Sequence, residues 1–468
     1  MNGECELGIY GLGVMGRNLL LNMADHGFRV AGYNRTPEKT ALLRGAGENV
    51  RAFENIEEFL AALRPPRAVM LLVAAGPPVD AVIAEMLPRL APGDCLVDGG
   101  NSFFKDTARR QIALAERGIF FLGAGVSGGE EGARHGPSLM PGGPREAWER
   151  VRPVFEAIAA RADGEPCVGY LGPGPLGHLV KMVHNGIEYA AMALIAETYD
   201  LMKRGLGLTN DELSAVYERW NTTDLRGFLV EITARILRQP DEKTGGRLVD
   251  AILDVTRQKG TGRWTTQTAL ELGVPVPCID TAVAMRDLSV LKAERAAAAA
   301  LSPGAPFHVN GSMDALLEHL HGALYAGLLI AFAQGMALLR TAARDYGNGL
   351  DLATVARIWR GGCIIRAEIL DAIAEAFRAR PELRNLLLDP VLTRHLASRA
   401  GDLRAAVSTA ASAGIPAPCL MAALGYYDSY RSARLPANLL EAQRDYFGAH
   451  GYERIGEEGT FHTEWSHE

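Results

Sequence analysis

The sequence predicts an α/β N-terminal domain of the doubly wound, Rossmann type, followed by an all-α helical domain and a C-terminal tail. Up to about residue 177, short apolar segments alternate with helix-like segments, which is typical of a parallel sheet with helices on both faces. From residue 178 onwards apolar residues recur at helical spacing, and little of the sequence is strand-like. A glycine-rich turn, GLGVMG at residues 11–16, joins the first predicted strand to the first predicted helix.

The N-terminal elements follow from this alternation. The predicted strands are ELGIYG (6–11), FRVAGYN (28–34), AVMLLVA (68–74), DCLVDGG (94–100), IFFLGAG (119–125) and CVGYLG (167–172). The predicted helices between them are Arg17–His26, Ile56–Leu63, Val79–Leu90, Lys105–Arg117 and Ala147–Ala159. The turn-forming string GPGPLG (172–177) marks the expected domain boundary.

The helical region has an expected internal duplication. YAAMALIAETYDLMK (189–203) resembles YAGLLIAFAQGMALLR (325–340), and a tryptophan-containing helix follows each at a similar distance. A duplicated helical unit and chance similarity between two Ala/Leu-rich helices both explain this pattern. The expected organisation is residues 1–177, 178–436 and 437–468, with the last segment reaching a partner subunit.

Composition narrows the functional class. The chain of 468 residues carries a net charge of −7, which argues against a nucleic-acid partner. Six scattered cysteines without a CxxC pair indicate reduced thiols. The N-terminus has no signal-peptide pattern, and no apolar run approaches the length of a membrane span. We therefore expect a cytoplasmic protein with neither a nucleic-acid nor a membrane partner.

The GLGVMG turn predicts a dinucleotide site. Gly11 permits the tight turn, Gly13 lets the backbone approach a pyrophosphate, and Gly16 lets the following helix pack close to the strand. Leu12, Val14 and Met15 complete the turn. A purely structural glycine-rich turn is the less favoured alternative.

The residues after the second predicted strand indicate NADP rather than NAD. An NAD site usually has an acidic residue there to hold the ribose 2′-hydroxyl. This chain has Asn34, Arg35 and Thr36 instead. No carboxylate repels a 2′-phosphate, and Arg35 can stack on adenine or pair with the phosphate.

The segment HLVKMVHNGIEY predicts a polar patch on a largely buried helix. Lys181, His184, Asn185 and Glu188 stand at i, i+3, i+4 and i+7, which places them on one helix face. Charged groups are rarely buried unless they are paired or functional. Taken alone, this segment fits an active site and a structural polar cluster equally well.

Other polar residues can bind an anionic substrate. The glycine-rich strings DGGNS (98–102) and GVSGGEEGARHGPSLMPGG (125–143) read as loops at the carboxyl ends of strands. Ser127, Gly128 and Gly129 offer a hydroxyl and backbone N–H groups to a carboxylate. Lys259, Thr261, Arg286, Arg444 and His450 could together hold a phosphate, although each alone is more often a surface residue.

These strings together resemble one family. GLGVMG, NRT, DGGNS, GVSGGEEGARHGPSLMPGG, VKMVHNGIEY, QKGTGRW, WRGGCIIR, NLLLDP and PANLLEAQRDYFGAH are similar to signature stretches of the decarboxylating 6-phosphogluconate dehydrogenases. The resemblance runs from about residue 7 to 465, in the right order, and fits the long two-domain form. It implies oxidation of 6-phospho-D-gluconate with NADP to ribulose 5-phosphate, CO2 and NADPH, in the oxidative pentose phosphate pathway.

The resemblance also implies residue roles. Lys181 falls on the family's general base and Glu188 on its general acid. Substrate-binding positions around the carboxylate and hydroxyls are Asn101, Ser127, Gly128, Gly129, His184, Asn185 and Tyr189, and phosphate positions are Lys259, Thr261 and Arg286. Arg444 and His450 match tail residues that act in the neighbouring subunit, which implies a homodimer. Val73, Ala74, Ala75 and Asn101 lie beside the cofactor, and Ala74 stands where the family commonly has lysine.

The chemistry itself fits these residues. A neutral lysine can take the proton of the C3 hydroxyl as hydride leaves C3. The resulting lysinium can then stabilise charge during decarboxylation, so we expect no metal requirement. A β-hydroxyacid dehydrogenase for a smaller acid, and a non-catalytic NADP-binding protein, are the alternatives.

Overall fold

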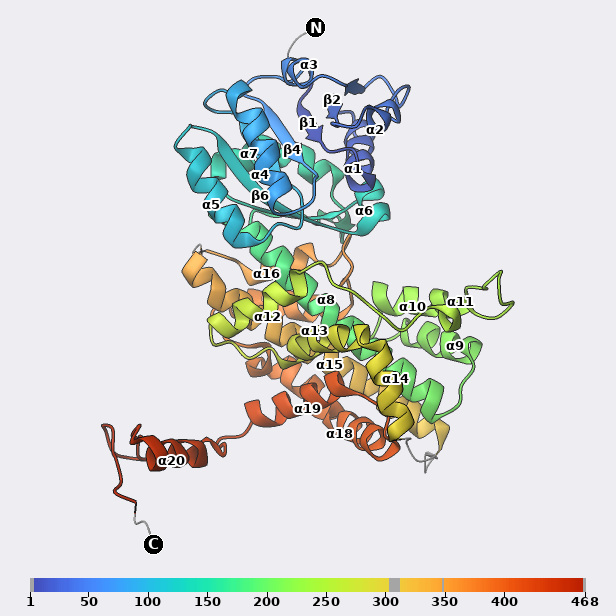
Figure 1. Cartoon of the computed structure of the whole chain (residues 1–468), viewed down its shortest axis with the longest axis vertical. Coiled ribbons are helices and arrows are strands. Elements are labelled where there is room, and N and C mark those ends of the chain that lie inside the picture. The colour runs from blue at the N-terminus through green and yellow to red at the C-terminus, as the bar shows by residue number, and fades with distance from the viewer. Residues whose placement is uncertain (1–3, 303–311, 347–348, 466–468) are drawn as a thin grey trace. The chain divides into compact units, whose positions relative to one another are not determined.

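Seven strands form one sheet in the order β3-β2-β1-β4-β5-β6-β7 in this computed structural model, which describes residues 4–302, 312–346 and 349–465 (Figure 1). The strands are β1 (Leu7–Tyr10), β2 (Val30–Tyr33), β3 (Val50–Phe53), β4 (Ala68–Leu71), β5 (Cys95–Asp98), β6 (Phe120–Ser127) and β7 (Ser138–Gly142). Strand order reverses between β1 and β4, so their carboxyl ends form the crevice where open α/β sheets bind ligands.

Two details of the sheet differ from the prediction. β7 runs antiparallel to β6, so the sheet is not fully parallel. Residues 167–172 do not form a strand, because only Val168 bridges to Leu139 of β7. The neighbouring Pro141 has no amide hydrogen to donate, which limits further pairing along that edge. β3 and β7 are the two edge strands, and neither was predicted.

Helices cover both faces of the sheet. They are α1 (Val14–Asp25), α2 (Pro37–Ala41), α3 (Ile56–Ala61), α4 (Pro77–Met86), α5 (Phe104–Ala115), α6 (Gly129–His135) and α7 (Arg145–Ile158). Buried side chains of α1, α6 and α7 share one apolar core with the sheet, and those of α3, α4 and α5 share the other. A 3-10 turn (Leu87–Arg89) follows α4, and β8 (Arg161–Ala162) pairs with β9 (Glu165–Pro166). The predicted doubly wound arrangement is confirmed.

The regular elements of the described chain after residue 175 are helices, joined by turns and irregular segments with a few isolated bridges. Its first helices are α8 (Leu176–Asp200), α9 (Asn210–Trp220), α10 (Phe228–Arg238), α11 (Leu248–Ala251), α12 (Thr261–Glu271), α13 (Pro277–Val290) and α14 (Lys292–Leu301). The later ones are α15 (Met313–Tyr346), α16 (Leu352–Ile358), α17 (Ile369–Ala379), α18 (Pro390–Ala413), α19 (Pro418–Tyr430) and α20 (Ala437–Gly448). A π-helical turn (Leu201–Gly205) ends α8, and a 3-10 turn (Leu386–Leu388) precedes α18.

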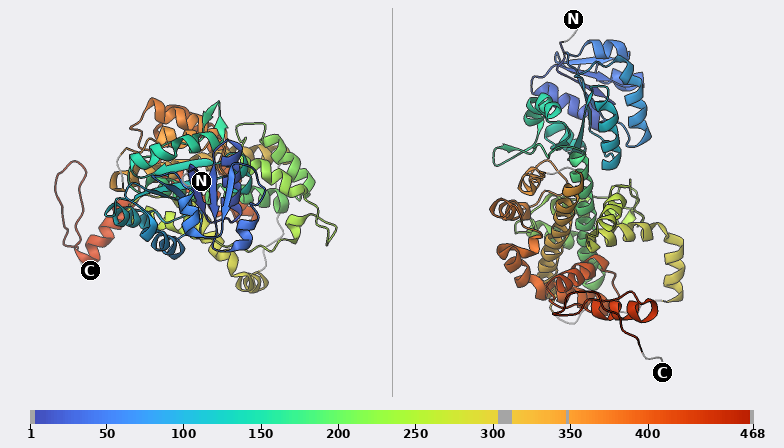
Figure 2. Two further views of the ribbon diagram at one scale, coloured as in Figure 1. Left: turned by 90° about the horizontal axis from the view of Figure 1, so that it is seen from above. Right: turned by 90° about the vertical axis from the view of Figure 1, so that its left-hand side faces the viewer.

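α8 and α15 form the centre of the helical region. α8 packs against β6 and β7 at one end and against α12, α13 and α15 farther along, so it joins the sheet to the helices (Figure 2). α15 is long and apolar enough to span a membrane, but 94% of its most apolar window is buried, as in the core helix of a soluble protein. The two segments that suggested a duplication lie in α8 and α15, and the duplication itself stays a prediction.

Residues 424–468 form a second unit. Between residues 431 and 465 only Asp445 and Gly451 are buried. The Asp445 carboxylate accepts hydrogen bonds from the amides of Gly451 and Thr463 and from the indole of Trp465, and contacts His462 Nδ1 at 2.8 Å. A buried carboxylate, rather than an apolar core, organises this segment.

Candidate active site

The predicted polar patch lies on α8, whose remaining surface is mostly apolar and buried. Lys181 is 6% exposed, His184 is fully buried and Asn185 is 9% exposed. The Glu188 side chain is 21% exposed. The four side chains therefore lie in largely apolar surroundings. In such a setting each charge is costly unless a neighbour compensates it.

Lys181 lies directly against strand β6. A Cβ atom placed on Gly125 would fall 2.4 Å from Lys181 Cβ, so only glycine lets the strand pass here. No described residue hydrogen-bonds to Lys181 Nζ or forms an ion pair with it within 4.0 Å. Burial lowers the pKa of Lys181, while the charge of Glu188 acts in the opposite direction. The ammonium form is thus less stable than in a free lysine, and the neutral amine, which can accept a proton, becomes more accessible.

His184 is a neutral imidazole held at both nitrogens. Its Nε2 lies 3.2 Å from Ser127 Oγ at the end of β6, and its Nδ1 lies 3.1 Å from Asn185 Oδ1. Burial, with the charge of Lys181 adding to it, holds the pKa of His184 well below its usual value. Because the amide oxygen can only accept, the network assigns the Nδ1–H tautomer, which leaves Nε2 to accept from the serine hydroxyl.

Glu188 and Tyr189 lie at the next turn of α8, and Arg286 of α13 lies beside them. Burial raises the pKa of Glu188, while Lys181 and Arg286 oppose the shift, so its protonated form is favoured relative to a free carboxyl. The Arg286 guanidinium lies 3.5 Å from the centroid of the Tyr189 ring. A cavity of about 520 Å3 opens beside Tyr189 and Arg286. Arg286 thus lies at this cavity and is also close enough for its charge to act on the Glu188 carboxyl.

α12 adds the next predicted residues. A Cβ on Gly262 would fall 2.5 Å from the Tyr189 ring, which puts the start of α12 against α8. Thr261, at that start, is buried, whereas Lys259 is exposed and has no hydrogen-bond or ion-pair partner among the described residues. Arg444 and His450 lie exposed in the separate 424–468 unit, where Arg444 pairs with Glu441 at 2.7 Å.

The glycine turn has the geometry of a dinucleotide site. Gly11 has φ +107°, and a Cβ there would fall 2.5 Å from the carbonyl oxygen of Leu72. A Cβ on Gly16 would fall 1.9 Å from the carbonyl oxygen of Gly11. Above Gly13, the N-cap of α1, a Cβ would meet nothing within 4 Å. The backbone is thus open where phosphate groups approach a helix N-terminus, and these residues fit an NADP cofactor.

Asn34, Arg35 and Thr36 follow β2 as predicted, but they differ in their contacts. Asn34 accepts the Leu12 amide at 2.9 Å and donates to the Thr36 carbonyl at 3.2 Å. Its side chain therefore holds the glycine turn. Arg35 is exposed and makes no hydrogen bond or ion pair within the described residues, so it is free to meet a ligand. Of the loop after β4, Ala74 is exposed, whereas Val73 and Ala75 are half-buried.

Comparison with known proteins identifies the family. The model of the NAD binding domain of 6-phosphogluconate dehydrogenase matches residues 6–172, and that of the 6-phosphogluconate dehydrogenase C-terminal domain matches residues 177–465. An NADP(+)-dependent, decarboxylating 6-phosphogluconate dehydrogenase of Bacillus subtilis is 51% identical, over 98% of this chain and 99% of the relative. The chain belongs to the 6-phosphogluconate dehydrogenase family.

Two further relatives bear on the fold and the cofactor. A solved structure of Plasmodium falciparum 6-phosphogluconate dehydrogenase matches with a TM-score of 0.95 and 42% identity, over 98% of this chain and all of that one. An NAD(+)-dependent, decarboxylating 6-phosphogluconate dehydrogenase of Bacillus subtilis is 48% identical over 98% of this chain. Family membership therefore establishes the fold. Because relatives of similar identity are named as NADP-dependent and as NAD-dependent, the preference between the two cofactors has to depend on local residues.

The string GVSGGEEGARHGPSLMPGG, read as one loop, folds differently. It forms the end of β6, then α6, then β7. Ser127 is the last residue of β6, and Gly128 and Gly129 have φ values of +122° and +63° at the start of α6. Asn101 is exposed on the turn between β5 and α5. Because this string is rich in glycine, it was predicted to be a loop, and the short helix α6 and the edge strand β7 were missed.

The segment after α16 is a part of the site that the sequence analysis did not assign. The Ile364 amide donates to Ser127 Oγ at 3.4 Å, and a Cβ on Gly128 would fall 2.6 Å from the Gly362 carbonyl oxygen. The Trp359 ring packs edge-on against His184 at 5.5 Å. In the sequence, this segment was indicated only by the string WRGGCIIR, in which two glycines allow close packing.

Among the residues that the structure describes, no three His, Cys, Asp or Glu side chains lie close enough together to hold a metal ion. On the polar face of α8, Lys181 is the described group that can supply positive charge to an oxyanion formed there.

Proposed function

We propose that the protein oxidises 6-phospho-D-gluconate with NADP and decarboxylates the product to D-ribulose 5-phosphate, a step of the oxidative pentose phosphate pathway. The single observation that carries the mechanism is the pair on one face of α8, the buried Lys181 and the half-buried Glu188, whose pKa values are shifted in opposite directions. Groups whose surroundings push their pKa values in opposite directions are suited to separate base and acid roles. Family membership supports the substrate.

The proposed mechanism uses Lys181 twice. As a neutral amine it takes the proton of the C3 hydroxyl, and NADP bound at the glycine turn would supply the hydride acceptor for C3. As an ammonium it then donates a hydrogen bond to the C3 oxygen, which stabilises the negative charge that develops when the C1–C2 bond breaks and C1 leaves as CO2. Glu188 finally protonates the former C2, which becomes C1 of ribulose 5-phosphate. No step needs a metal ion.

Other residues bind and orient the substrate in this scheme. The carboxylate and hydroxyls are held by Asn101, Ser127, Gly128, Gly129, His184, Asn185 and Tyr189, and the phosphate by Lys259, Thr261 and Arg286. The exposed Lys259, which has no hydrogen-bond or ion-pair partner among the described residues, supports the phosphate assignment, because a free cation binds phosphate without first losing a protein partner. The Arg286 guanidinium is held in place by its stack on the Tyr189 ring.

We further propose a cytoplasmic homodimer in which the tail completes the site of its partner. Each of the six cysteines is a buried free thiol, as suits a reducing compartment. In the 424–468 unit, Leu439, Leu440, Phe447 and Ile455 are between 59% and 89% exposed. A segment with so little buried apolar surface needs a covering surface to be stable. A second copy of the chain supplies it in this proposal.

The central test is NADPH formation with CO2 release from 6-phosphogluconate and NADP. The Lys181→Ala substitution should lower kcat by about 10³-fold, since it removes both the base and the later ammonium. EDTA should leave the rate of the parent protein unchanged. Strong EDTA inhibition that added metal reverses would contradict the proposed role of the Lys181 ammonium.

The pH dependence should separate the two groups. Lys181 must be neutral at the start, so the rate should fall as the pH drops below its lowered pKa. Glu188 must be protonated, so the rate should fall as the pH rises above its raised pKa. Glu188→Gln should lower kcat by about 10²-fold and remove the alkaline limb of the kcat profile. The exposed Glu116→Gln is the control, and an unchanged alkaline limb in Glu188→Gln would refute the assignment.

Cofactor choice should depend on Arg35, because Asn34 is engaged by the glycine turn. Arg35→Asp should lower kcat/KM for NADP by about 10-fold to 100-fold, as expected for loss of a charge-assisted hydrogen bond plus repulsion of the 2′-phosphate. kcat/KM for NAD should change far less. The exposed Arg44→Asp is a matched control, and a parent protein that prefers NAD would contradict the proposal.

Mixed dimers test the proposed tail. Arg444→Ala should lower activity through the loss of a phosphate contact, and Lys181→Ala should abolish it. When differently tagged Lys181→Ala and Arg444→Ala chains are co-expressed and the mixed dimer is purified, one site holds an intact Lys181 and an intact tail from the other chain. About half of the parental activity should return. No gain over the two variants would show that each tail serves its own chain.

A further inference from the structure

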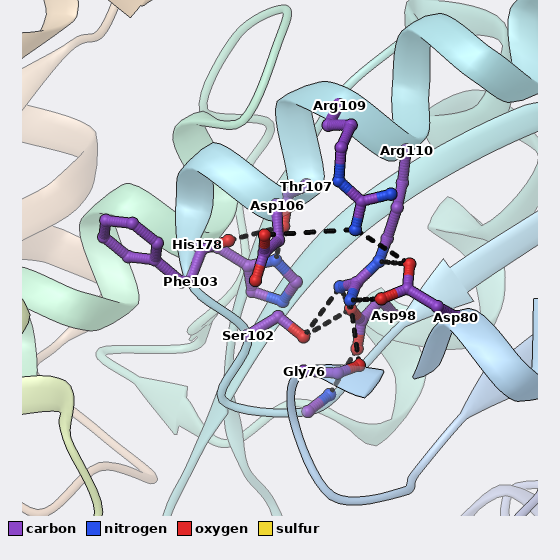
Figure 3. A network of polar contacts seen from close by, with 11 residues as sticks. Gly76, Asp80, Asp98, Ser102, Phe103, Asp106, Thr107, Arg109, Arg110 and His178 are labelled. Carbon is purple, nitrogen blue, oxygen red and sulfur yellow. Dashed lines mark hydrogen bonds and ion pairs between the residues drawn. The ribbon is translucent and has the colours of Figure 1, made fainter. Parts of the chain in front are cut away.

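A buried arginine lies beneath the two loops that flank the proposed site. Arg110 of α5 is 2% exposed, and its guanidinium lies between the start of α4 and the end of β5 (Figure 3). It makes a two-pronged contact with Asp80 of α4, at 2.9 and 3.0 Å. The position of Arg110 therefore depends on several elements at once.

The same guanidinium reaches both loops. Its Nη2 donates to the Gly76 carbonyl at 3.0 Å, at the end of the β4–α4 loop. Its Nη1 donates to Ser102 Oγ at 3.4 Å and lies 3.5 Å from Asp98 Oδ2, in the β5–α5 loop. One planar, rigid donor group thus bridges two loops that are distant in the sequence.

The β5–α5 loop is tightly folded around Asp98. The fully buried Asp98 carboxylate accepts the Gly100 amide at 3.0 Å and the Ser102 hydroxyl at 2.6 Å. Asn101, the proposed substrate contact, stands exposed between these two anchored residues. The backbone of Asn101 therefore has little freedom as long as Asp98 stays in place.

The two loops and the glycine turn also touch each other. A Cβ on Gly100 would fall 3.1 Å from the Val73 carbonyl oxygen, and one on Gly11 would fall 2.5 Å from that of Leu72. A displacement of either loop is consequently transmitted to the cofactor turn, because the contacts leave no gap to absorb it.

A second contact joins this network to α8. Thr107, one turn before Arg110 on α5, lies 2.6 Å from Nδ1 of the buried His178 (Figure 3). His178 is one turn before Lys181 on α8. The proposed base and the two loops are thus attached to the same face of α5.

We propose that Arg110 is a positioning residue, which holds the β4–α4 and β5–α5 loops in the relative placement that hydride transfer needs. This inference rests on the proposed function. Arg110 contacts neither proposed base nor proposed acid, and it acts through the loops that carry Ala74 and Asn101. Because misplacement by about 1 Å can cost about 10²-fold in rate, a tie between the two loops affects kcat without touching the reacting atoms.

Stability alone does not require this network. Burying an arginine and an aspartate has a large desolvation cost, and apolar residues of similar volume often stabilise a fold as well or better. What the guanidinium provides, and an apolar side chain cannot, is a set of directed hydrogen bonds to both loops.

The test compares Arg110→Lys with Arg109→Lys. Arg109 is the neighbouring residue, also donates to Asp80 at 2.9 Å, and has a 58% exposed side chain that reaches neither loop. Rates are expressed per active site, from NADPH-binding stoichiometry. Arg110→Lys should lower kcat by about 10-fold to 100-fold, with substrate KM nearly unchanged. The isotope effect with 6-phosphogluconate deuterated at C3 should rise, because hydride transfer becomes slower. Arg109→Lys should match the parent protein in all three quantities.

A double variant covers the case in which Arg110→Lys folds poorly. Arg110→Met with Asp98→Asn leaves no unpaired buried charge and should show the same fall in kcat. Hydrogen exchange supplies a readout without substrate: the Gly100 amide should exchange faster in both variants. Parental kcat and isotope effect in both variants, even with a lower Tm, would overturn the proposal.

The proposed function fails separately if the parent protein forms no NADPH from 6-phosphogluconate. In that case the role of Arg110 is tested by hydrogen exchange of the Gly100 amide and by the Kd for NADP. If both quantities in the variants equal those of the parent protein, the proposed role of Arg110 is refuted.

Discussion

The close approach of α8 to strands β6 and β7 is the constraint on which the site depends. Glycines make it possible at four points: Gly123 and Gly125 in β6, Gly142 in β7 and Gly177 in α8. A Cβ on Gly177 would fall 2.1 Å from the Gly123 carbonyl oxygen, and one on Gly142 would fall 2.2 Å from the Gly177 amide nitrogen. Any side chain at these positions would push the helix away from the sheet. Lys181 would then lose its place beside the strand that carries Ser127.

The same close packing gives the site its electrostatics. With β6 on one side and the rest of the helical bundle on the other, water has little access to this face of α8, and burial becomes the largest influence on Lys181, His184 and Glu188. Burial acts in opposite chemical directions on an amine and a carboxyl, since it disfavours the charged form of each. The same apolar environment therefore makes the neutral form of the lysine, which can accept a proton, more accessible and keeps the glutamate more readily protonated.

Features that arise from local pattern could mostly be predicted from the sequence. The glycine turn, the face of α8 and the helical C-terminal region each depend on residues close together in the chain, and the structure has all three. The features that escaped prediction depend on distant pairing. The edge strand β7 ends in Pro141 and Gly142, so its strand propensity is poor, and it forms because β6 offers an open edge. The contact of Ile364 with Ser127 joins residues far apart in sequence, and no local pattern signals it.

A further limit concerns polar residues that look alike in the sequence. Asn34 was predicted to bind the cofactor, and Asp98, Arg110 and His178 are equally polar in the sequence, yet the side chains of all four are hydrogen-bonded within the protein. Arg35 and Lys259 have no such partner among the described residues, and so meet a ligand without first breaking a contact. The hydrogen-bonded residues fix where the turn and loops lie, whereas the exposed side chains without such a partner add little to that framework and stay available for a ligand.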